Sequence, residues 1–130
     1  MSKKRILILE DDRSLRSMLK EELEAEGFIV HDASDGYMGF KILESIPLPD
    51  LIITDLDMPN LDGREFLKQK KQNQLLKKIP TIIVSGVADV DKFTDKTTIA
   101  VSKPFDMNEL VKSIRAHILS IGEDDLRLLP

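Results

Sequence analysis

Short apolar runs that alternate with longer segments of helical period limit most strongly how this chain can fold. Five such runs are strand candidates: residues 6–9, 28–30, 51–54, 81–84 and 99–101. This alternation is typical of parallel sheets, because helices join neighbouring parallel strands and cover both faces. We therefore expect an α/β fold: a doubly wound five-stranded parallel sheet with helices on both faces.

The first segment between these runs has the clearest helical pattern. Leu15, Met18, Leu19 and Leu23 recur at helical spacing. Gly27 follows them, in the place where a left-handed C-terminal cap would end the helix. The pattern predicts a helix that buries this leucine-rich face.

Turn and capping residues indicate the other helices. An Asp-Gly turn at residues 35–36 precedes a second helix, which Pro47 closes. A third helix should begin near Gly63. Asp106 and Glu109 form a capping box at the start of the last helix.

The length and charge of the chain narrow its organisation and its partners. The 130 residues, 42% of them hydrophobic, suit one domain, which we place at residues 1–122 with a C-terminal tail at 123–130. The 23 acidic and 19 basic residues give a net charge of -4, which opposes direct nucleic acid binding. We expect no such binding.

Cysteine usage and hydropathy bear on the compartment. The sequence has no cysteine, which excludes disulfides and thiolate metal sites. No uninterrupted apolar stretch approaches the roughly 18–20 residues of a membrane span, and the first apolar run is too short for a signal peptide. We expect a cytoplasmic protein without membrane association.

Residues that can carry chemistry follow the strand candidates at their carboxyl ends. In chain order they are Glu10, Asp11, Asp12, Asp55, Ser85 and Lys103. The functional crevice of an open parallel sheet lies beyond these ends, so we expect the side chains to converge at one rim.

Several carboxylates at one rim repel one another and favour a bound divalent cation. Oxygen ligands without histidine or cysteine are typical of Mg²⁺. We expect Asp11 to hold the metal, with Glu10 beside it through water, and Asp55 to be the nucleophile that forms an acyl phosphate. Lys103 would place its charge against one phosphoryl oxygen, and the Ser85 hydroxyl would donate to another.

Helix capping and turns explain some of these residues without any chemistry. Acids commonly precede a helix and cap its free N–H groups, and we assign Asp12 to that role. Two adjacent acids at the end of an apolar strand exceed what capping requires, so Glu10 and Asp11 stay in the site. The Ser85 hydroxyl before a glycine would also fit a simple turn.

Four segments of the sequence, in this order, resemble the receiver domains of bacterial response regulators, the CheY-like family with a flavodoxin-like fold. They are ILILEDD, ITDLDMPNLDG with Asp55, IIVSG with Ser85, and SKPF with Lys103. The resemblance covers residues 5–120. It implies that Asp55 accepts a phosphoryl group from a sensor histidine kinase or phosphotransfer protein. It also implies that Asp11, Asp55 and the backbone carbonyl of Asp57 hold Mg²⁺, and that a change of shape then signals to a downstream protein, which the sequence does not identify.

Two features depart from the family pattern. The family has an aromatic residue three positions before the lysine, where this chain has Ala100, so the usual aromatic readout cannot operate. The interval from Ser85 to Lys103 is also shorter than usual by about one helical turn, roughly four residues. We therefore expect a short fourth helix within residues 89–96. Receiver domains often pair through this region. Because the region is altered in this chain, we expect a monomer.

Two alternatives stay open. Asp55-Leu56-Asp57 resembles the DxD motif of haloacid-dehalogenase-type phosphatases, although that motif normally lies on the first strand of a larger protein. The second alternative is a receiver-like binding module that acts without phosphorylation, which Ala100 and the shortened fourth segment favour. The reading we prefer is a phosphorylation-activated response regulator of two-component signal transduction, and not an enzyme.

Overall fold

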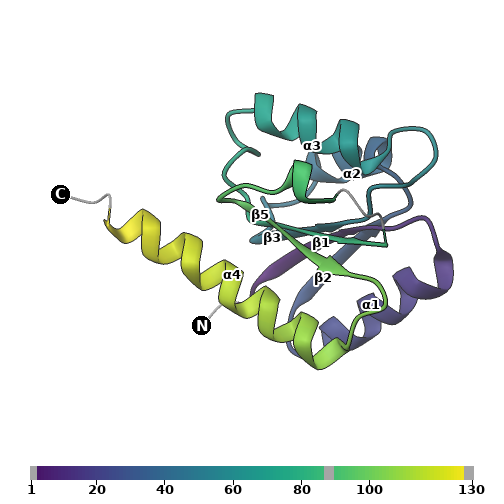
Figure 1. Cartoon of the computed structure of the whole chain (residues 1–130), viewed down its shortest axis with the longest axis horizontal. Coiled ribbons are helices and arrows are strands. Elements are labelled where there is room, and N and C mark those ends of the chain that lie inside the picture. Colours follow the sequence, from purple (N-terminus) through teal and green to yellow (C-terminus); the bar gives the residue numbers. More distant parts are fainter. Residues whose placement is uncertain (1–2, 87–89, 128–130) are drawn as a thin grey trace.

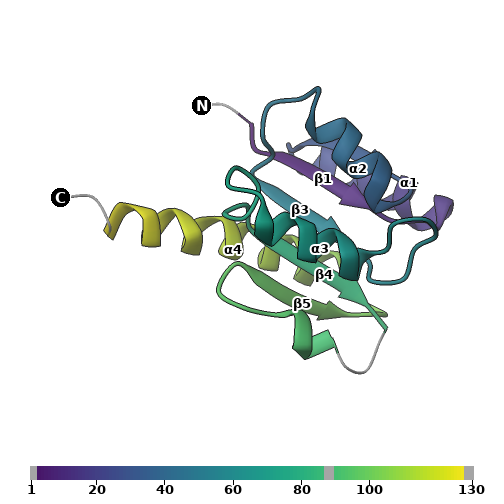
Figure 2. The same ribbon diagram turned by 90° about the horizontal axis from the view of Figure 1, so that it is seen from above.

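Five strands form one parallel sheet in the order β2-β1-β3-β4-β5 (Figures 1 and 2). The computed structural model describes residues 3–86 and 90–127, with side chains as far as residue 120. The strands are β1 (Arg5–Leu9), β2 (Ile29–Ala33), β3 (Leu51–Thr54), β4 (Thr81–Ser85) and β5 (Thr98–Ser102). The predicted fold class is confirmed.

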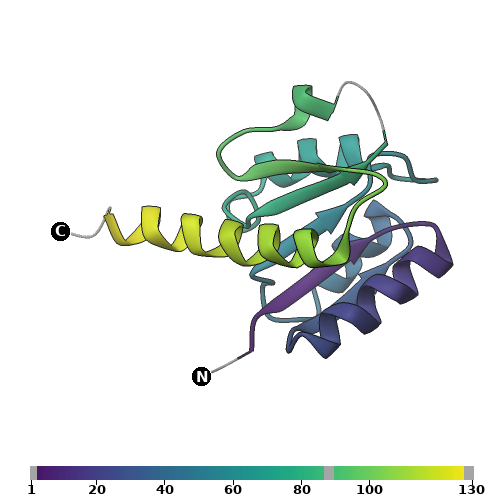
Figure 3. The same cartoon turned by 60° about the horizontal axis from the view of Figure 1, so that its bottom comes forward.

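Helices cover both faces of this sheet. They are α1 (Arg13–Ala25), α2 (Gly36–Leu43), α3 (Gly63–Gln72), the 3₁₀ turn η1 (Val90–Phe93) and α4 (Met107–Arg127). Figure 1 shows α1 and α4 on one face and α2 and α3 on the other. Figure 3 shows the C-terminal part of α4 projecting beyond the sheet. Among the described helices, none combines the length and the hydropathy that a membrane-spanning segment needs.

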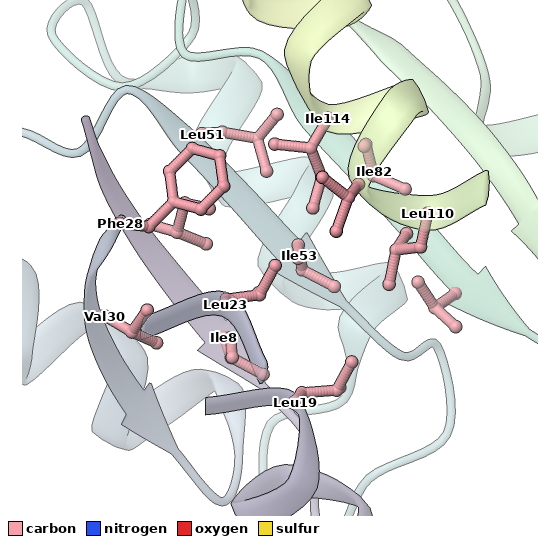
Figure 4. Close-up of a cluster of buried hydrophobic side chains, with 13 residues drawn as sticks. Ile8, Leu19, Leu23, Phe28, Val30, Leu51, Ile53, Ile82, Leu110 and Ile114 are labelled. Carbon is pink, nitrogen blue, oxygen red and sulfur yellow. The ribbon is translucent and has the colours of Figure 1, made fainter. Parts of the chain in front are cut away.

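The larger core lies between the sheet and the α1/α4 layer. Ile8 and Ile53 of the central strands meet Leu19 and Leu23 of α1 and Leu110 of α4 there (Figure 4). The helical spacing of the apolar residues in α1 points them at the sheet. Gly27 follows with a positive φ of 98°, as predicted for a left-handed cap.

The opposite face carries a second core under α2 and α3. Phe66 of α3 is fully buried and stacks on Phe40 of α2, with ring centroids 4.5 Å apart. Nearby, Leu56, Leu67 and Ile83 form a small separate cluster at the β4 and β5 side of the sheet. This smaller cluster is the one on which η1 packs.

The second strand differs from its predicted bounds. The sequence predicts residues 28–30, whereas β2 runs from Ile29 to Ala33. Because β2 is an edge strand, it carries polar residues that the expectation of a doubly covered apolar strand excluded. His31 bonds to Arg5 and Asp32 pairs with Arg16, which keeps both polar side chains satisfied at the edge.

The helix expected within residues 89–96 is short, as the sequence predicts: residues 90–96 contain one 3₁₀ turn and no α-helix, and residue 89 lies outside the described residues. The described residues between β4 and β5 contain the 3₁₀ turn η1, and none of its residues is buried. Val90 and Phe93 are half-buried against the small cluster, beside Ala100 of β5. The fourth helix position is therefore occupied by one loosely packed turn.

The last two helices start where the sequence predicts. α3 begins at Gly63, and α4 begins after Asp106, whose carboxylate accepts from the backbone N–H groups of Asn108 and Glu109. Residues 123–127, which the sequence analysis separates as part of a tail, continue α4, and residues 128–130 of that tail lie outside the described residues.

Candidate functional site

The strand order places the first and third strands side by side, where the chain connections leave in opposite directions. Leu9 and Thr54 are register partners on β1 and β3, so the residues that follow them, Glu10 and Asp55, emerge next to each other. The Asp55 backbone N–H donates to the Leu9 carbonyl at 3.1 Å, which continues the ladder into the site. Sheets of this type form their functional crevice at such a switch point.

Lys103 connects these two strand ends. Its Nζ donates to Oδ2 of Asp55 at 2.8 Å and to Oε1 of Glu10 at 3.0 Å. The three residues are far apart in sequence, and the parallel register brings them together because every strand ends at the same edge. The predicted convergence at one rim is confirmed for these side chains.

The second oxygen of Asp55 is also held. Oδ1 accepts from the backbone N–H of Leu56 at 2.6 Å and from that of Asp57 at 3.3 Å. Asp55 is 9% exposed, so its carboxylate is largely shielded from solvent. These bonds fix the orientation of the carboxylate before any reaction partner arrives.

Asp11 completes a group of three carboxylates with Glu10 and Asp55. One oxygen from each residue lies within 4.8 Å of the others, and Asp11 is exposed. With each group in its ordinary charge state, three carboxylates and one ammonium leave two negative charges. An all-oxygen set with this excess of negative charge suits a hard divalent ion such as Mg²⁺.

The pKa values of Glu10 and Lys103, which form an ion pair, are both raised. Burial is the largest influence on Glu10, which is 4% exposed, and it raises the pKa of that carboxyl despite the bonds from Asp12 and Lys103. Burial lowers the pKa of Lys103, but its bonds to Asp55 and Glu10 outweigh this and raise it. Lys103 is therefore held as an ammonium between two acids.

Ser85 and Lys103 are joined through the backbone. Ser85 ends β4, is 3% exposed and is the register partner of Ser102. The Lys103 N–H donates to the Ser85 carbonyl at 3.0 Å, and the peptide bond from Lys103 to Pro104 is cis. This hydrogen bond holds Lys103, which follows β5, at the same rim as Ser85.

Asp12 and Asp57 lie outside the three-carboxylate group. Asp12 caps α1, with its Oδ1 accepting from the Leu15 N–H at 3.1 Å, as the sequence analysis assigned it. The Asp57 side chain is 65% exposed and pairs with Arg64 at 2.8 Å. The carboxylate of Asp57 therefore points to α3, while its N–H supports Asp55.

Gly63 sets how closely α3 approaches Asp55. A Cβ on Gly63 would collide with the Asp55 carbonyl oxygen and would lie 2.8 Å from Cα of Leu56. The Gly63 N–H donates to the Leu56 carbonyl at 2.9 Å. Glycine is required here because the start of α3 packs on the backbone that carries Asp55.

A latch between α2 and the loop after β3 was not predicted. Asp35 caps α2 at the Met38 N–H and accepts from Nδ2 of Asn60 at 2.8 Å. Burial raises the pKa of Asp35, but bonds from Asn60, Met38 and Tyr37 outweigh it and lower the value. Asn60 has a positive φ of 62°, and an Asn in a Pro-Asn turn was the available signal.

Comparison with known proteins agrees with this geometry. A model of the response regulator receiver domain matches residues 6–115. The chain is 38% identical over 116 residues to the response regulator ArlR of Staphylococcus saprophyticus, covering 86% of this chain and 51% of that protein. It is 27% identical over 122 residues to sporulation initiation phosphotransferase F of Bacillus subtilis, covering 91% of this chain and 96% of that protein. The chain thus spans about half the length of ArlR and nearly all of the second relative.

A solved structure agrees in the same way. The CheY-like response regulator receiver domain protein of Methanospirillum hungatei superposes with a TM-score of 0.84 at 26% identity, covering 95% of this chain and 99% of that one. The family match covers most of the chain. The chain belongs to the response regulator receiver domain family, the signalling modules of two-component systems.

Proposed function

We propose that Asp55 accepts a phosphoryl group from a histidine kinase or phosphotransfer protein, and that the resulting change of shape is read by a downstream protein. The observation that carries this proposal is the contact of Lys103 with both Asp55 and Glu10, next to Asp11. A carboxylate can form an acyl phosphate, and the ammonium opposite it can balance the charge that arrives.

Each residue has a distinct part in this transfer. An oxygen of Asp55 forms the new bond to phosphorus while the bond from phosphorus to the donor nitrogen breaks, and the charge of the phosphoryl oxygens is shared with Lys103. The Ser85 hydroxyl, at the end of β4, would donate to one of those oxygens. Asp11 and Asp55 would hold Mg²⁺, with Glu10 beside it and the Asp57 carbonyl as a further ligand. The ion would reduce the repulsion between the carboxylates and the incoming anion.

The proposal includes the partners and the place of the protein. We propose a cytoplasmic monomer that takes its phosphoryl group from a protein donor and has no direct contact with nucleic acid. Supporting this are the net charge of -4 and the 3₁₀ turn in the region through which receiver domains often pair. Hydrolysis of the acyl phosphate would end the signal.

The phosphatase alternative is less well supported. Asp57 would have to act as its general acid or base, yet its carboxylate is turned to Arg64. The family match over residues 6–115 further favours a signalling module. The module that acts without phosphorylation differs from our proposal in one measurable respect, the reaction of Asp55.

Intact-mass measurement after treatment with acetyl phosphate and Mg²⁺ tests this reaction. We expect one added phosphoryl group on the unaltered chain and none on Asp55→Asn. The control Asp12→Asn should still gain one phosphoryl group, because Asp12 caps α1 outside the site. Chelation of the metal should lower the yield at least tenfold. An unmodified mass with Mg²⁺ present would favour the phosphorylation-independent module. Steady turnover of p-nitrophenyl phosphate would favour the phosphatase.

A further inference from the structure

A groove separates α3 from the 3₁₀ turn η1, on the face of the sheet that α2 and α3 cover. It encloses a volume of about 570 Å³. Figure 2 shows η1 beside β5, on the same face as α3 and to one side of it. No residue of η1 is buried, so this single turn covers the flank of α3 incompletely. The described residues between β4 and β5 form one 3₁₀ turn and no α-helix, and the groove lies beside that turn.

Charge and apolar surface meet in this groove. Its lining includes four cations, Arg64, Lys68, Lys71 and Lys92, and two acids, Asp62 and Glu65. Leu67 and Phe93 line it as well, both packed in the small cluster with Leu56. The lining carries two more positive than negative groups, although the whole chain has a net charge of -4. An excess of positive charge in a concave surface attracts negatively charged ligands.

The spacing of the cations indicates the size of the ligand. Arg64, Lys68 and Lys71 lie at positions i, i+4 and i+7 of α3, so they share one face of the helix over roughly 10 Å. Lys71 pairs with Asp95 at 3.2 Å, an exposed contact that contributes little stability and that a new carboxylate can replace. This length suits two or three carboxylates on a peptide turn, with an apolar side chain between them.

Arg64 connects the groove with the acceptor site. Its NH1 donates to Oδ1 of Asp57 at 2.8 Å, and its guanidinium lies 5.8 Å from the centre of the Phe93 ring. The Asp57 N–H in turn donates to Asp55. A phosphoryl group on Asp55 adds about one to two negative charges two residues from Asp57, which increases the electrostatic attraction of Arg64 toward the acceptor site.

We propose that the groove between α3 and η1 is the output surface of this receiver domain. It binds an acidic peptide segment of a partner protein, which places an apolar side chain on Phe93 once phosphorylation draws Arg64 toward Asp55. The inference rests on the proposed function, because it needs a phosphoryl group on Asp55. Linkage makes the effect reciprocal: a bound acidic segment stabilises the phosphorylated state by the same factor.

Fluorescence anisotropy with a defined probe tests this surface. The probe is a fluorescein-labelled 14-residue peptide with Glu and Leu at helical spacing; the matched control has Gln for every Glu. Binding is measured with Mg²⁺, with and without beryllium fluoride, which binds a carboxylate as a stand-in for the phosphoryl group. We expect the acidic peptide to bind at least tenfold more tightly with beryllium fluoride, and the Gln peptide to bind at least tenfold more weakly than the acidic one.

Charge variants locate the binding site. The double variant Lys68→Glu with Lys71→Glu should weaken peptide binding at least tenfold, whereas Lys112→Glu, at an exposed lysine on α4, should change peptide affinity less than twofold. Arg64→Gln should remove the difference in peptide affinity between the protein with beryllium fluoride and the protein without it. These three variants separate the groove, the general charge of the protein and the link to Asp55.

Three results would overturn the proposal: no binding of the acidic peptide, equal binding by the Lys68/Lys71 and Lys112 variants, or tighter binding of a 14-nucleotide single-stranded DNA. Intact mass after acetyl phosphate distinguishes the two levels of the argument. A chain that is phosphorylated but shows no change in peptide affinity refutes the output surface alone. A chain that is never phosphorylated refutes the proposed function first.

Discussion

Two regions of the same sheet differ in how tightly they are packed. The acceptor rim contains Glu10, Asp55 and Lys103, and the η1 corner is the 3₁₀ turn Val90–Phe93 with the small cluster on which it packs. At the rim, Glu10 and Asp55 are nearly buried, and each oxygen of Asp55 accepts a hydrogen bond. At the corner, no residue of η1 is buried and Phe93 packs on a cluster of three buried residues. Hydrogen bonds therefore hold both carboxylate oxygens of Asp55, whereas η1 packs on only a few buried side chains.

This difference shows which part of a receiver domain tolerates change. The rim must position several charged atoms against one another, and each misplacement leaves a buried charge without its partner. The corner makes fewer contacts that depend on one another, so it can lose a helical turn and an aromatic at Ala100 while the rim keeps its geometry. We expect local stability to follow the same order, because weakly packed turns open most easily.

Replacing one phenylalanine in each region gives the largest expected contrast. Phe66→Ala should lower the free energy of unfolding by about 3–5 kcal/mol, because the ring is fully buried against Phe40. Phe93→Ala should cost about 1 kcal/mol, because its ring is half-buried in the groove. Urea denaturation followed by circular dichroism measures both values.

The fitted slope of each denaturation curve is the control for this pair. An unchanged slope shows that the same surface is exposed on unfolding, so that the two free energies can be compared. Equal losses for the two variants would show that η1 is packed as firmly as α3, and would remove the distinction between the regions.

A methyl group added to a glycine in each region sharpens the comparison at the backbone. Gly63→Ala should cost about 3 kcal/mol, because its Cβ would collide with the Asp55 carbonyl oxygen and displace α3. Gly86→Ala, after β4, should change stability by less than about 0.5 kcal/mol, because no described atom lies within 4 Å of its Cβ. Thermal unfolding measures both, and a neutral Gly63→Ala would contradict the close packing of α3 on the site.

Lys70, near the end of α3, gives a pH-dependent contrast. It is 2% exposed, and burial lowers its pKa from 10.5 to about 8, with Asp95 opposing and Lys71 adding to the effect. The unfolded chain keeps this proton up to pH 10.5, so it binds more protons than the folded chain between these two pH values. The free energy of unfolding should therefore rise with pH across that window, by on the order of 3 kcal/mol.

Lys70→Met tests this expectation. It should remove the rise with pH and add about 1–3 kcal/mol of stability at pH 7, because the buried ammonium is replaced by an apolar chain. The exposed neighbour Lys68→Met should keep the rise and leave stability within about 0.5 kcal/mol. Denaturation series at several pH values measure the free energy of unfolding of both variants. If it still rises with pH in Lys70→Met, the rise comes from the titration of another group.

The sequence by itself determined the fold class and most of the rim. Apolar runs of strand length, separated by helical periods, allow few arrangements, and parallel strands present their following residues at a common edge. Glu10, Asp11 and Asp55 could therefore be assigned to one rim with Lys103. The shortened segment before β5 could be predicted too, because the resemblance to receiver domains supplies the usual residue count for comparison.

Only the tertiary structure decided the contacts made across elements. The Asp35 to Asn60 latch, the placement of Asp57 on Arg64 and the burial of Lys70 each join residues whose local sequence predicts a turn or a solvated surface. The extent of β2 belongs with them, since the apolar run that predicts it ends at Val30, whereas the edge strand continues through polar residues to Ala33. Local patterns report which face of an element is apolar, whereas the partner of a polar side chain is set by which elements come to lie beside it.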